Sequence, residues 1–238
     1  MHEPLGPGLV IGASSGIGLA VFRRLAGQVK LTAAARTPMV VERVGATWSP
    51  CDVRDPASVA RCVTQAAGGG KLDFIVSAAG VGYYAPLTGD YAPQWREILE
   101  TNVLGLLNLL AVVHRQQPEL RILVQIGSLA AHRVSRTPGN LVYSVSKAAA
   151  RTILSEYRSQ IRGEGRTTKI ALVSPGFVRD TRFGDRFFSH QPAAARDLYA
   201  GVSALTPDQV ATAVVDLLHA EDEVEVTEVV LRPRGQAD

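Results

Sequence analysis

Short apolar runs alternate with amphipathic stretches along the whole chain, and this alternation limits the folds open to it. Seven runs have the length and apolar character of buried strands: 8–11, 30–35, 46–49, 72–78, 121–128, 169–174 and 224–233. Near-continuous apolar strands are expected where both faces of a sheet are covered. The pattern therefore predicts an α/β chain, a doubly wound Rossmann fold in which helices cover both faces of a seven-stranded, mostly parallel sheet.

Helical periodicity fills the gaps between the predicted strands. Helices are expected over 16–27, 55–67, 93–116, 143–161 and 206–220. Asp55 before Pro56 suits the start of the second helix, and Thr206 with Gln209 matches a capping box at the start of the last. The helix over 93–116 is apolar almost all round, so we expect the sheet to bury one side and a partner subunit another.

No internal repeat, low-complexity tract or linker divides the 238 residues, and we interpret 1–238 as one domain. The longest irregular stretch is 176–205. It is too long for a simple connection between two elements. This stretch is therefore predicted to be a lid that covers a substrate.

Composition argues against several classes of function. The net charge is only +3, and the basic residues are scattered without aromatic neighbours, which argues against a nucleic-acid partner. Cys51 and Cys62 do not have metal-ligand spacing, and no cluster of histidine, cysteine or acidic residues has it, so no metal is expected. There is no run of eighteen apolar residues and no secretory signal pattern. We therefore expect a cytoplasmic protein without a membrane partner.

A glycine-rich stretch, GASSGIG at 12–18, follows the first predicted strand and opens the first helix. Its glycines allow a tight turn and a close approach of the backbone to a ligand. The helix N-terminus behind them presents free N–H groups that suit a pyrophosphate. We interpret the stretch as a dinucleotide site, the alternative being an ordinary glycine-rich turn. The expected contacts are Gly12, Ser14, Ser15, Gly16, Ile17 and Gly18.

Arg36 stands at the end of the second predicted strand. In this architecture that position meets the adenosine ribose, where an acid suits the 2′-hydroxyl of NAD and a base suits the 2′-phosphate of NADP. No acid lies beside Arg36, while Thr37 and Ser14 add hydroxyl donors. The pattern favours NADP(H) as the cofactor, the alternative being an exposed strand-end arginine.

The stretch YSVSK places Tyr143 four residues before Lys147. Residues four apart share one face of a helix. A nearby cation lowers the pKa of a tyrosine from near 10 and makes its proton easier to exchange. The pair alone also fits two surface residues that share a helix face.

These motifs occur in the order seen in short-chain dehydrogenases/reductases, and the chain resembles that family over essentially its whole length. The motifs are GASSGIG, CDV at 51–53, SAAG at 77–80, NVLG at 102–105, IGS ending at Ser128, YSVSK, and SPGFV at 174–178. The resemblance implies hydride transfer between NADPH and a ketone or aldehyde. It also implies a small-molecule carbonyl or alcohol substrate and a homodimer or homotetramer.

The resemblance assigns catalytic roles to four residues. It makes Tyr143 the general acid/base, Lys147 its partner, and Ser128 the donor of a hydrogen bond to the substrate oxygen. Asn102 would hold a water in the proton relay. The further cofactor contacts that it implies are Asp52, Val53, Ala78, Ala79, Gly80, Tyr143, Lys147, Pro175, Gly176 and Val178.

The chain departs from the family pattern at several positions. Ile11 stands where a threonine is usual, and Ser77 stands where an asparagine is usual. The segment from Arg36 to Asp52 is too short for the usual helix after the second strand, so an open adenosine edge is expected. Near 174–178 the usual threonine is displaced by one position, and we assign no cofactor contact to Thr181.

Aromatic and basic side chains gather in the predicted lid. The aromatic residues are Phe177, Phe183, Phe187, Phe188 and Tyr199, with Tyr83 and Tyr84 expected on the opposite wall. They suit an apolar or ring-bearing carbonyl. The arginines are Arg179, Arg182, Arg186 and Arg196, and a solvated surface explains them better than an anion site.

Two classes of function stay open on the sequence. The first is an NADP(H)-dependent carbonyl reductase or alcohol dehydrogenase. The second is a non-catalytic NADP(H)-binding sensor or scaffold, since a fold does not imply its chemistry. The intact set of Ser128, Asn102, Tyr143 and Lys147 favours the enzyme. An epimerase or dehydratase is less favoured, because the chain has no room for the larger substrate domain that those enzymes usually carry.

Overall fold

The computed structural model describes residues 4–116, 119–133, 139–187 and 203–236. Seven strands form one sheet in the order β3-β2-β1-β4-β5-β6-β7, and every neighbouring pair is parallel. The strands are β1 Gly8–Ile11, β2 Leu31–Ala35, β3 Ala46–Pro50, β4 Phe74–Ser77, β5 Ile122–Ile126, β6 Lys169–Pro175 and β7 Glu228–Leu231. The predicted fold class is confirmed. The strand order reverses between β1 and β4, where doubly wound sheets bind their ligands.

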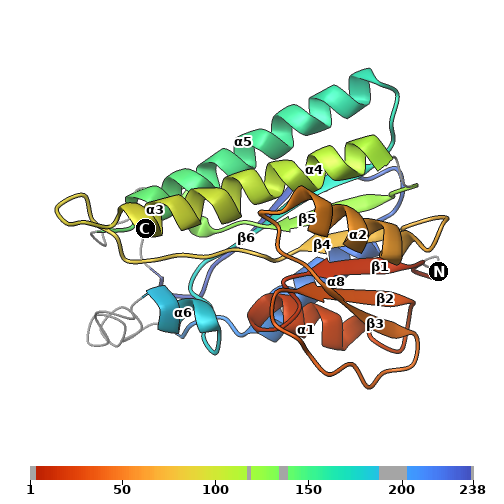
Figure 1. The fold of residues 1–238 in the computed structure, drawn as a ribbon, viewed down its shortest axis with the longest axis horizontal. Helices are drawn as coiled ribbons and strands as arrows, with labels where there is room; N and C mark the ends of the chain where they lie inside the picture. The colour runs from red at the N-terminus through yellow and green to blue at the C-terminus, as the bar shows by residue number, and fades with distance from the viewer. Residues whose placement is uncertain (1–3, 117–118, 134–138, 188–202, 237–238) are drawn as a thin grey trace.

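Helices cover both faces of the sheet (Figure 1). One face carries α1 Gly16–Leu25 and α8 Pro207–Leu218, and the other carries α2 Pro56–Ala67, α4 Gly105–Gln116 and α5 Leu141–Gly163. Successive strand residues point to opposite faces. Leu9 packs with the α2, α4 and α5 side, while its neighbour Val10 packs with α1 and α8. This alternation is why the strands are apolar without interruption.

The predicted helix starts are confirmed by their caps. The Asp55 carboxylate accepts a hydrogen bond from the Ala57 amide at 2.9 Å, directly before α2. Thr206 and Gln209 form a reciprocal capping box at the start of α8. Both caps satisfy N–H groups that the first turn of a helix leaves without a partner.

The stretch 93–116, predicted as one helix, consists of three pieces. It contains α3 Ala92–Leu99, a π-helical turn η1 Glu100–Leu104, and α4. Such turns insert one extra residue into a helix and occur often at functional sites. The whole run, Ala92–Gln116, is long and apolar enough to cross a membrane by length and composition. Half of its most apolar window is buried inside the protein.

The connection between β2 and β3 contains no helix, as the short spacing predicts. The base of the predicted lid is pinned by two hydrogen bonds. The Arg179 amide donates to the Leu205 carbonyl at 2.9 Å, and the Leu205 amide donates to the Phe177 carbonyl at 2.8 Å. A short helix within the lid, α6 Arg182–Phe187, was not predicted. Phe188, Arg196 and Tyr199 lie outside the described residues.

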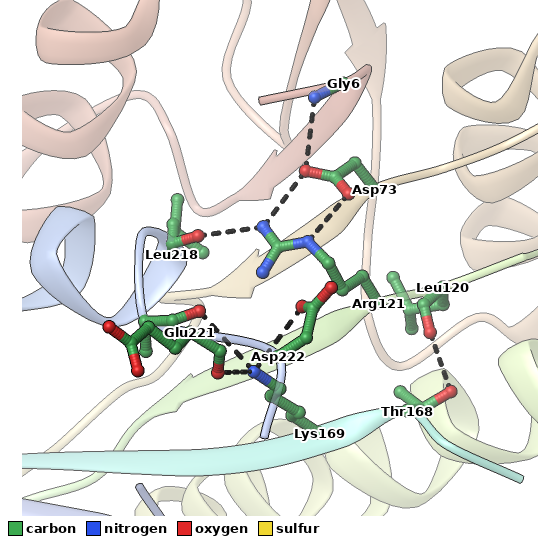
Figure 2. Close-up of polar contacts among 10 residues, drawn as sticks. Gly6, Asp73, Leu120, Arg121, Thr168, Lys169, Leu218, Glu221 and Asp222 are labelled. Atoms are coloured by element: carbon green, nitrogen blue, oxygen red, sulfur yellow. Dashed lines mark hydrogen bonds and ion pairs between the residues drawn. The ribbon is translucent and has the colours of Figure 1, made fainter. Parts of the chain in front are cut away.

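A polar cluster joins the strands at their amino ends, on the edge opposite the glycine loop (Figure 2). Asp73, just before β4, binds the guanidinium of Arg121, just before β5, through contacts of 2.9 and 3.1 Å. The same carboxylate accepts from the Gly6 amide at 3.2 Å. Arg121 also donates to the Leu218 carbonyl at 2.8 Å, which gives a partner to the end of α8.

Lys169, the first residue of β6, extends this amino-edge cluster (Figure 2). Its ammonium donates to the Glu221 carbonyl and lies 3.7 Å from the Asp222 carboxylate. The neighbouring Thr168 hydroxyl donates to the Leu120 carbonyl at 2.8 Å. The cluster therefore ties the ends of three strands to the segment that follows α8.

Candidate active site

The glycine loop between β1 and α1 packs tightly against the protein's own backbone and lines the cavity. Gly12 has φ +82°, and a Cβ placed on it would lie 2.7 Å from the Ala79 amide nitrogen. A Cβ on Gly18 would lie 2.3 Å from the Gly12 carbonyl oxygen. Ser15, the N-cap of α1, makes no side-chain capping bond, and no acid stands in the first turn. The first N–H groups of α1 are therefore left for an anion.

One arginine lies beyond the end of β2, and another lies beyond the end of β3. Arg36 and Thr37 follow β2 and line the cavity beside the glycine loop. Arg54 donates hydrogen bonds to both oxygens of the Asp52 carboxylate, with Nη2–Oδ2 at 2.6 Å and Nε–Oδ1 at 3.0 Å. These hydrogen bonds from Arg54 are the main cause that lowers the pKa of Asp52, and the charge of Arg36 contributes further. Asp52 is held as a carboxylate at this edge.

Ser128 lies two residues beyond β5 and caps a single 3-10 turn, Leu129–Ala131. Its Oγ accepts a hydrogen bond from the Ala130 amide at 3.1 Å. Because the oxygen accepts from the backbone, the orientation of the hydroxyl is restricted while its hydrogen remains available to donate. Ser128 is therefore suited to donate to an oxygen in the cavity.

Tyr143 and Lys147 lie on the first two turns of α5, and both are buried. The Lys147 ammonium is 5.8 Å from the centre of the Tyr143 ring and donates to the Ile126 carbonyl at 3.2 Å. Burial lowers the pKa of Lys147 from 10.5 to about 8. The two side chains therefore share one helix face.

Asn102 sits in the π-helical turn and braces the loop after β4. Its Nδ2 donates to the Val81 carbonyl at 2.8 Å and to the Ser146 hydroxyl at 3.0 Å. Its Oδ1 accepts from the Val81 amide at 2.9 Å. Both amide hydrogens have protein partners, so the side chain acts here as a clamp. The predicted role in holding a relay water stays a prediction.

Two aromatic rings of α6 cover the tyrosine. The Phe183 ring lies 5.1 Å from the Tyr143 ring and the Phe187 ring lies 6.1 Å from it. The Tyr84 amide donates to the Phe187 carbonyl at 2.9 Å and fixes the end of α6. Gly82 makes room for the rings, since a Cβ there would lie 2.5 Å from Phe183. The tyrosine therefore faces an apolar wall.

These features meet in one cavity of about 530 Å³, and all but one of the predicted site residues line it. They are Gly12, Ser14, Ser15, Gly16, Ile17, Gly18, Arg36, Thr37, Asp52, Val53, Ala78, Ala79, Gly80, Ser128, Tyr143, Lys147, Pro175, Gly176 and Val178. Asn102 is buried behind the cavity wall. The carboxyl ends of β1, β2, β4, β5 and β6 all contribute, as expected for ligand sites in doubly wound sheets.

A comparison with protein families identifies the family of this chain. The model of the family described as short chain dehydrogenase matches residues 8–192. The chain belongs to the short chain dehydrogenase family. It is therefore an oxidoreductase of a family that binds nicotinamide cofactors.

Individual short chain dehydrogenases resemble the protein over nearly its full length. Dehydrogenase/reductase SDR family member 11 of Bos taurus is 28% identical over 247 residues, which cover 96% of each chain. Farnesol dehydrogenase of Aedes aegypti is 29% identical over 250 residues, again 96% of each. Among solved structures, an alcohol dehydrogenase from the archaeon Thermococcus sibiricus complexed with 5-hydroxy-NADP has a TM-score of 0.78, 27% identity and 99% coverage of both chains.

The closed form of a serine dehydrogenase complexed with NADP+ shares the fold, with a TM-score of 0.79 and 22% identity. The alignment covers 97% of this chain and 96% of that one. The short chain dehydrogenase architecture is therefore retained where most side chains differ.

Several cavity residues of this short chain dehydrogenase were not assigned to the site from the sequence, among them Thr181, Gln236 and Thr101. Thr181 lies over the glycine loop, its Cγ2 3.3 Å from where a Cβ of Gly16 would stand. The Gln236 side chain accepts from the Phe177 amide at 3.0 Å and lines the cavity from the far end of the chain. Thr101 precedes Asn102 and also lines it. Thr101 and Thr181 each lie near a recognised motif, whereas Gln236 had no signal in the sequence.

Proposed function

We propose that the protein is an NADP(H)-dependent oxidoreductase that transfers hydride between NADPH and an apolar or ring-bearing ketone or aldehyde. The observation that carries this proposal is a shared cavity. Ser128, Tyr143 and Lys147 line the same space as the glycine loop. Proton donor, hydrogen-bond donor and dinucleotide cradle are thus within one site.

The residues present fit a bound dinucleotide. The glycine loop lines the cavity, and the uncapped N-terminus of α1 suits the pyrophosphate. Arg36 would pair with a 2′-phosphate on the adenosine ribose. When bound there in its reduced form, the cofactor supplies hydride to the carbonyl carbon.

The chain's own residues handle the carbonyl oxygen. Ser128 donates a hydrogen bond to that oxygen, because its own oxygen is already held by the Ala130 amide. Tyr143 gives the oxygen its proton, and the Lys147 ammonium stabilises the phenolate that results. Asn102 acts as a positioning residue that fixes Val81 beside the site.

The aromatic wall supports the substrate class. Phe183 and Phe187 lie against Tyr143, so a carbonyl that reaches the tyrosine also touches apolar rings. Farnesol dehydrogenase of Aedes aegypti, which its name links to an apolar alcohol, is among the relatives. An apolar or aryl group on the carbonyl carbon is therefore expected to improve binding.

Tyr143→Phe tests the chemistry. The variant removes the proton donor and is expected to lower kcat by about 10²–10⁴-fold, with little change in the Kd for NADPH. Wild type is first screened with NADPH against apolar and aryl ketones and aldehydes. Tyr157→Phe on the same helix is the matched control, since Tyr157 does not line the cavity. Full turnover in Tyr143→Phe overturns the mechanism. NADPH binding without turnover of any carbonyl by wild type supports the sensor or scaffold instead.

Paired titrations with NADPH and NADH, read by nicotinamide fluorescence, test the cofactor. We expect NADPH to bind at least about tenfold tighter, a difference of about 1.4 kcal/mol. Arg36→Ala should remove this preference, while Arg43→Ala, a change at an exposed arginine outside the cavity, should keep it. Equal affinities in wild type would contradict the assignment to NADP(H).

From the resemblance to short-chain dehydrogenases/reductases we also propose a homodimer or homotetramer, in which α4 and α5 form the contact between subunits. Exposed apolar side chains on and before these helices support it: Leu104, Leu107, Leu141 and Val145. Sedimentation velocity over a range of concentrations checks this proposal, and a monomer at all of them would overturn it.

A further inference from the structure

The segment after β7 folds back onto the carboxyl edge of the sheet and places Gln236 in the wall of the cavity. The Gln236 amide donates to the Pro233 carbonyl at 3.1 Å, and Arg232 Nη2 donates to the Gln236 carbonyl at 2.8 Å. Gln236 is 6% exposed and lines the cavity of the candidate active site. A glutamine side chain is rarely buried to this extent unless its polar atoms have partners.

The partner of the Gln236 side chain is the start of the predicted lid. Its Oε1 accepts a hydrogen bond from the Phe177 amide at 3.0 Å. Gly176 makes this approach possible, because a Cβ there would lie 2.2 Å from Oε1. The Phe177 carbonyl accepts from the Leu205 amide at 2.8 Å. Gln236 and Leu205 therefore hold the two polar backbone groups of Phe177.

The chain that follows Phe177 leads directly into the aromatic wall. The connection 178–181 joins Phe177 to α6, which begins at Arg182. The rings of Phe183 and Phe187 on α6 lie 5.1 and 6.1 Å from the Tyr143 ring. A connection this short leaves little slack, so a displacement of Phe177 also displaces the rings over Tyr143.

We propose that Gln236 is a positioning residue for the carbonyl substrate. Its Oε1 fixes Phe177, and Phe177 fixes where α6 places its rings over Tyr143. This inference rests on the proposed function, because the ligand that touches those rings is the carbonyl. Gln236 follows β7, at the opposite end of the strand order from β2 and Arg36. Loss of its hydrogen bond should therefore weaken carbonyl binding more than NADPH binding.

The first test measures the contact itself, in cofactor-free protein and without any substrate. Gln236→Met keeps the size of the side chain and removes the acceptor, whereas Gln236→Glu keeps an acceptor oxygen. The measurement is amide hydrogen exchange at Phe177. We expect exchange about fivefold faster in Gln236→Met, as for the loss of one net hydrogen bond, and close to wild type in Gln236→Glu.

The second test measures the consequence for the reaction. The substrate is the aryl or apolar carbonyl that wild type reduces fastest in the NADPH screen. Gln236→Met should raise its KM about fivefold, while kcat and the Kd for NADPH stay within about twofold of wild type. Gln236→Glu should restore the KM, because it restores the acceptor for the Phe177 amide.

Gln116→Met is the matched control, because Gln116 also joins distant segments by a side-chain hydrogen bond. Its Nε2 donates to the Ala60 carbonyl at 3.2 Å, and the residue does not line the cavity. The same substitution there should leave exchange at Phe177, the KM and the Kd for NADPH unchanged.

Several outcomes would overturn the inference. Unchanged exchange at Phe177 in Gln236→Met would refute it and leave the proposed function standing. Faster exchange with an unchanged KM would show that Gln236 only stabilises the turn. A larger rise in KM for Gln236→Glu than for Gln236→Met would assign the effect to the Nε2 hydrogens and a direct ligand contact. Faster exchange in a protein whose wild type reduces no carbonyl would refute the proposed function and, with it, the positioning role.

Discussion

The two edges of the sheet treat polar groups in opposite ways. At the amino edge the polar groups are paired within the protein (Figure 2). Arg121 binds the Asp73 carboxylate and the Leu218 carbonyl, and Lys169 forms an ion pair with Asp222. At the carboxyl edge, Ser15 leaves the N-terminus of α1 uncapped, and Thr101 has a hydroxyl without a partner among the described residues. The amino ends of β4, β5 and β6 therefore carry a satisfied network, whereas at the carboxyl edge the first N–H groups of α1 have no side-chain cap.

This difference predicts that residues at the amino edge of the sheet mainly affect stability and residues at the carboxyl edge mainly affect ligand binding. Polar groups that are paired inside the protein stabilise the folded chain, and breaking such a pair leaves a buried group uncompensated. Polar groups left open cost stability until a ligand pairs with them, as is common at functional sites. Changes at the amino edge should therefore alter unfolding, and changes at the carboxyl edge should alter affinity and turnover.

The largest effect is expected from Arg121→Met at the amino edge. The change removes the hydrogen-bond donor of the buried Asp73 carboxylate and of the Leu218 carbonyl. It should lower the free energy of unfolding by about 3 kcal/mol. Urea unfolding measures the loss, and fluorescence titration should show an unchanged Kd for NADPH. Arg115→Met, at an exposed arginine of α4, is the control and should be near neutral. A matching loss of NADPH affinity in Arg121→Met would mean that the two edges are coupled.

A smaller effect is expected from the pH dependence of Lys147. Burial lowers its pKa to about 8 in the folded protein, against 10.5 without burial. Between these values the unfolded chain binds the extra proton, so stability rises with pH in this window. From pH 7.5 to 9.5 the rise should be about 2 kcal/mol in cofactor-free protein.

Lys147→Met should lack this rise and be more stable than wild type below pH 8. Urea unfolding of both proteins at the two pH values gives the difference directly. If the difference in unfolding free energy between wild type and variant did not change with pH, burial would not lower the pKa of Lys147, and this prediction would be wrong.

The smallest effect is expected from Gly82→Ala beneath the aromatic wall. The added Cβ would lie 2.5 Å from the Phe183 ring, so α6 must shift away from Tyr143, at a cost of about 1 kcal/mol. The KM for an apolar carbonyl should rise about fivefold while the Kd for NADPH stays the same. Gly163→Ala, at a glycine of α5 with no atoms within 4 Å of the added Cβ, is the control. An unchanged KM would show that the rings do not form the substrate wall.

Most of the fold followed from local patterns. Continuous apolar runs predicted the seven strands, and the caps at Asp55 and Thr206 marked helix starts that the structure retains. The glycine loop and the YSVSK stretch predicted residues that line one cavity, because each pattern is set by neighbours in the chain. The π-helical turn at Glu100–Leu104 was not predicted, since its residues read as an unbroken apolar helix.

The sequence by itself determined the doubly wound sheet, the glycine loop after its first strand and the spacing of Tyr143 and Lys147. Only the tertiary structure decided which distant segments complete the site. Gln236 reaches Phe177 across 59 positions of the chain, and Asn102 reaches Ser146 across 44. The physical reason is that periodicity and spacing record contacts within one element, whereas these contacts exist only after the helices have packed on the sheet.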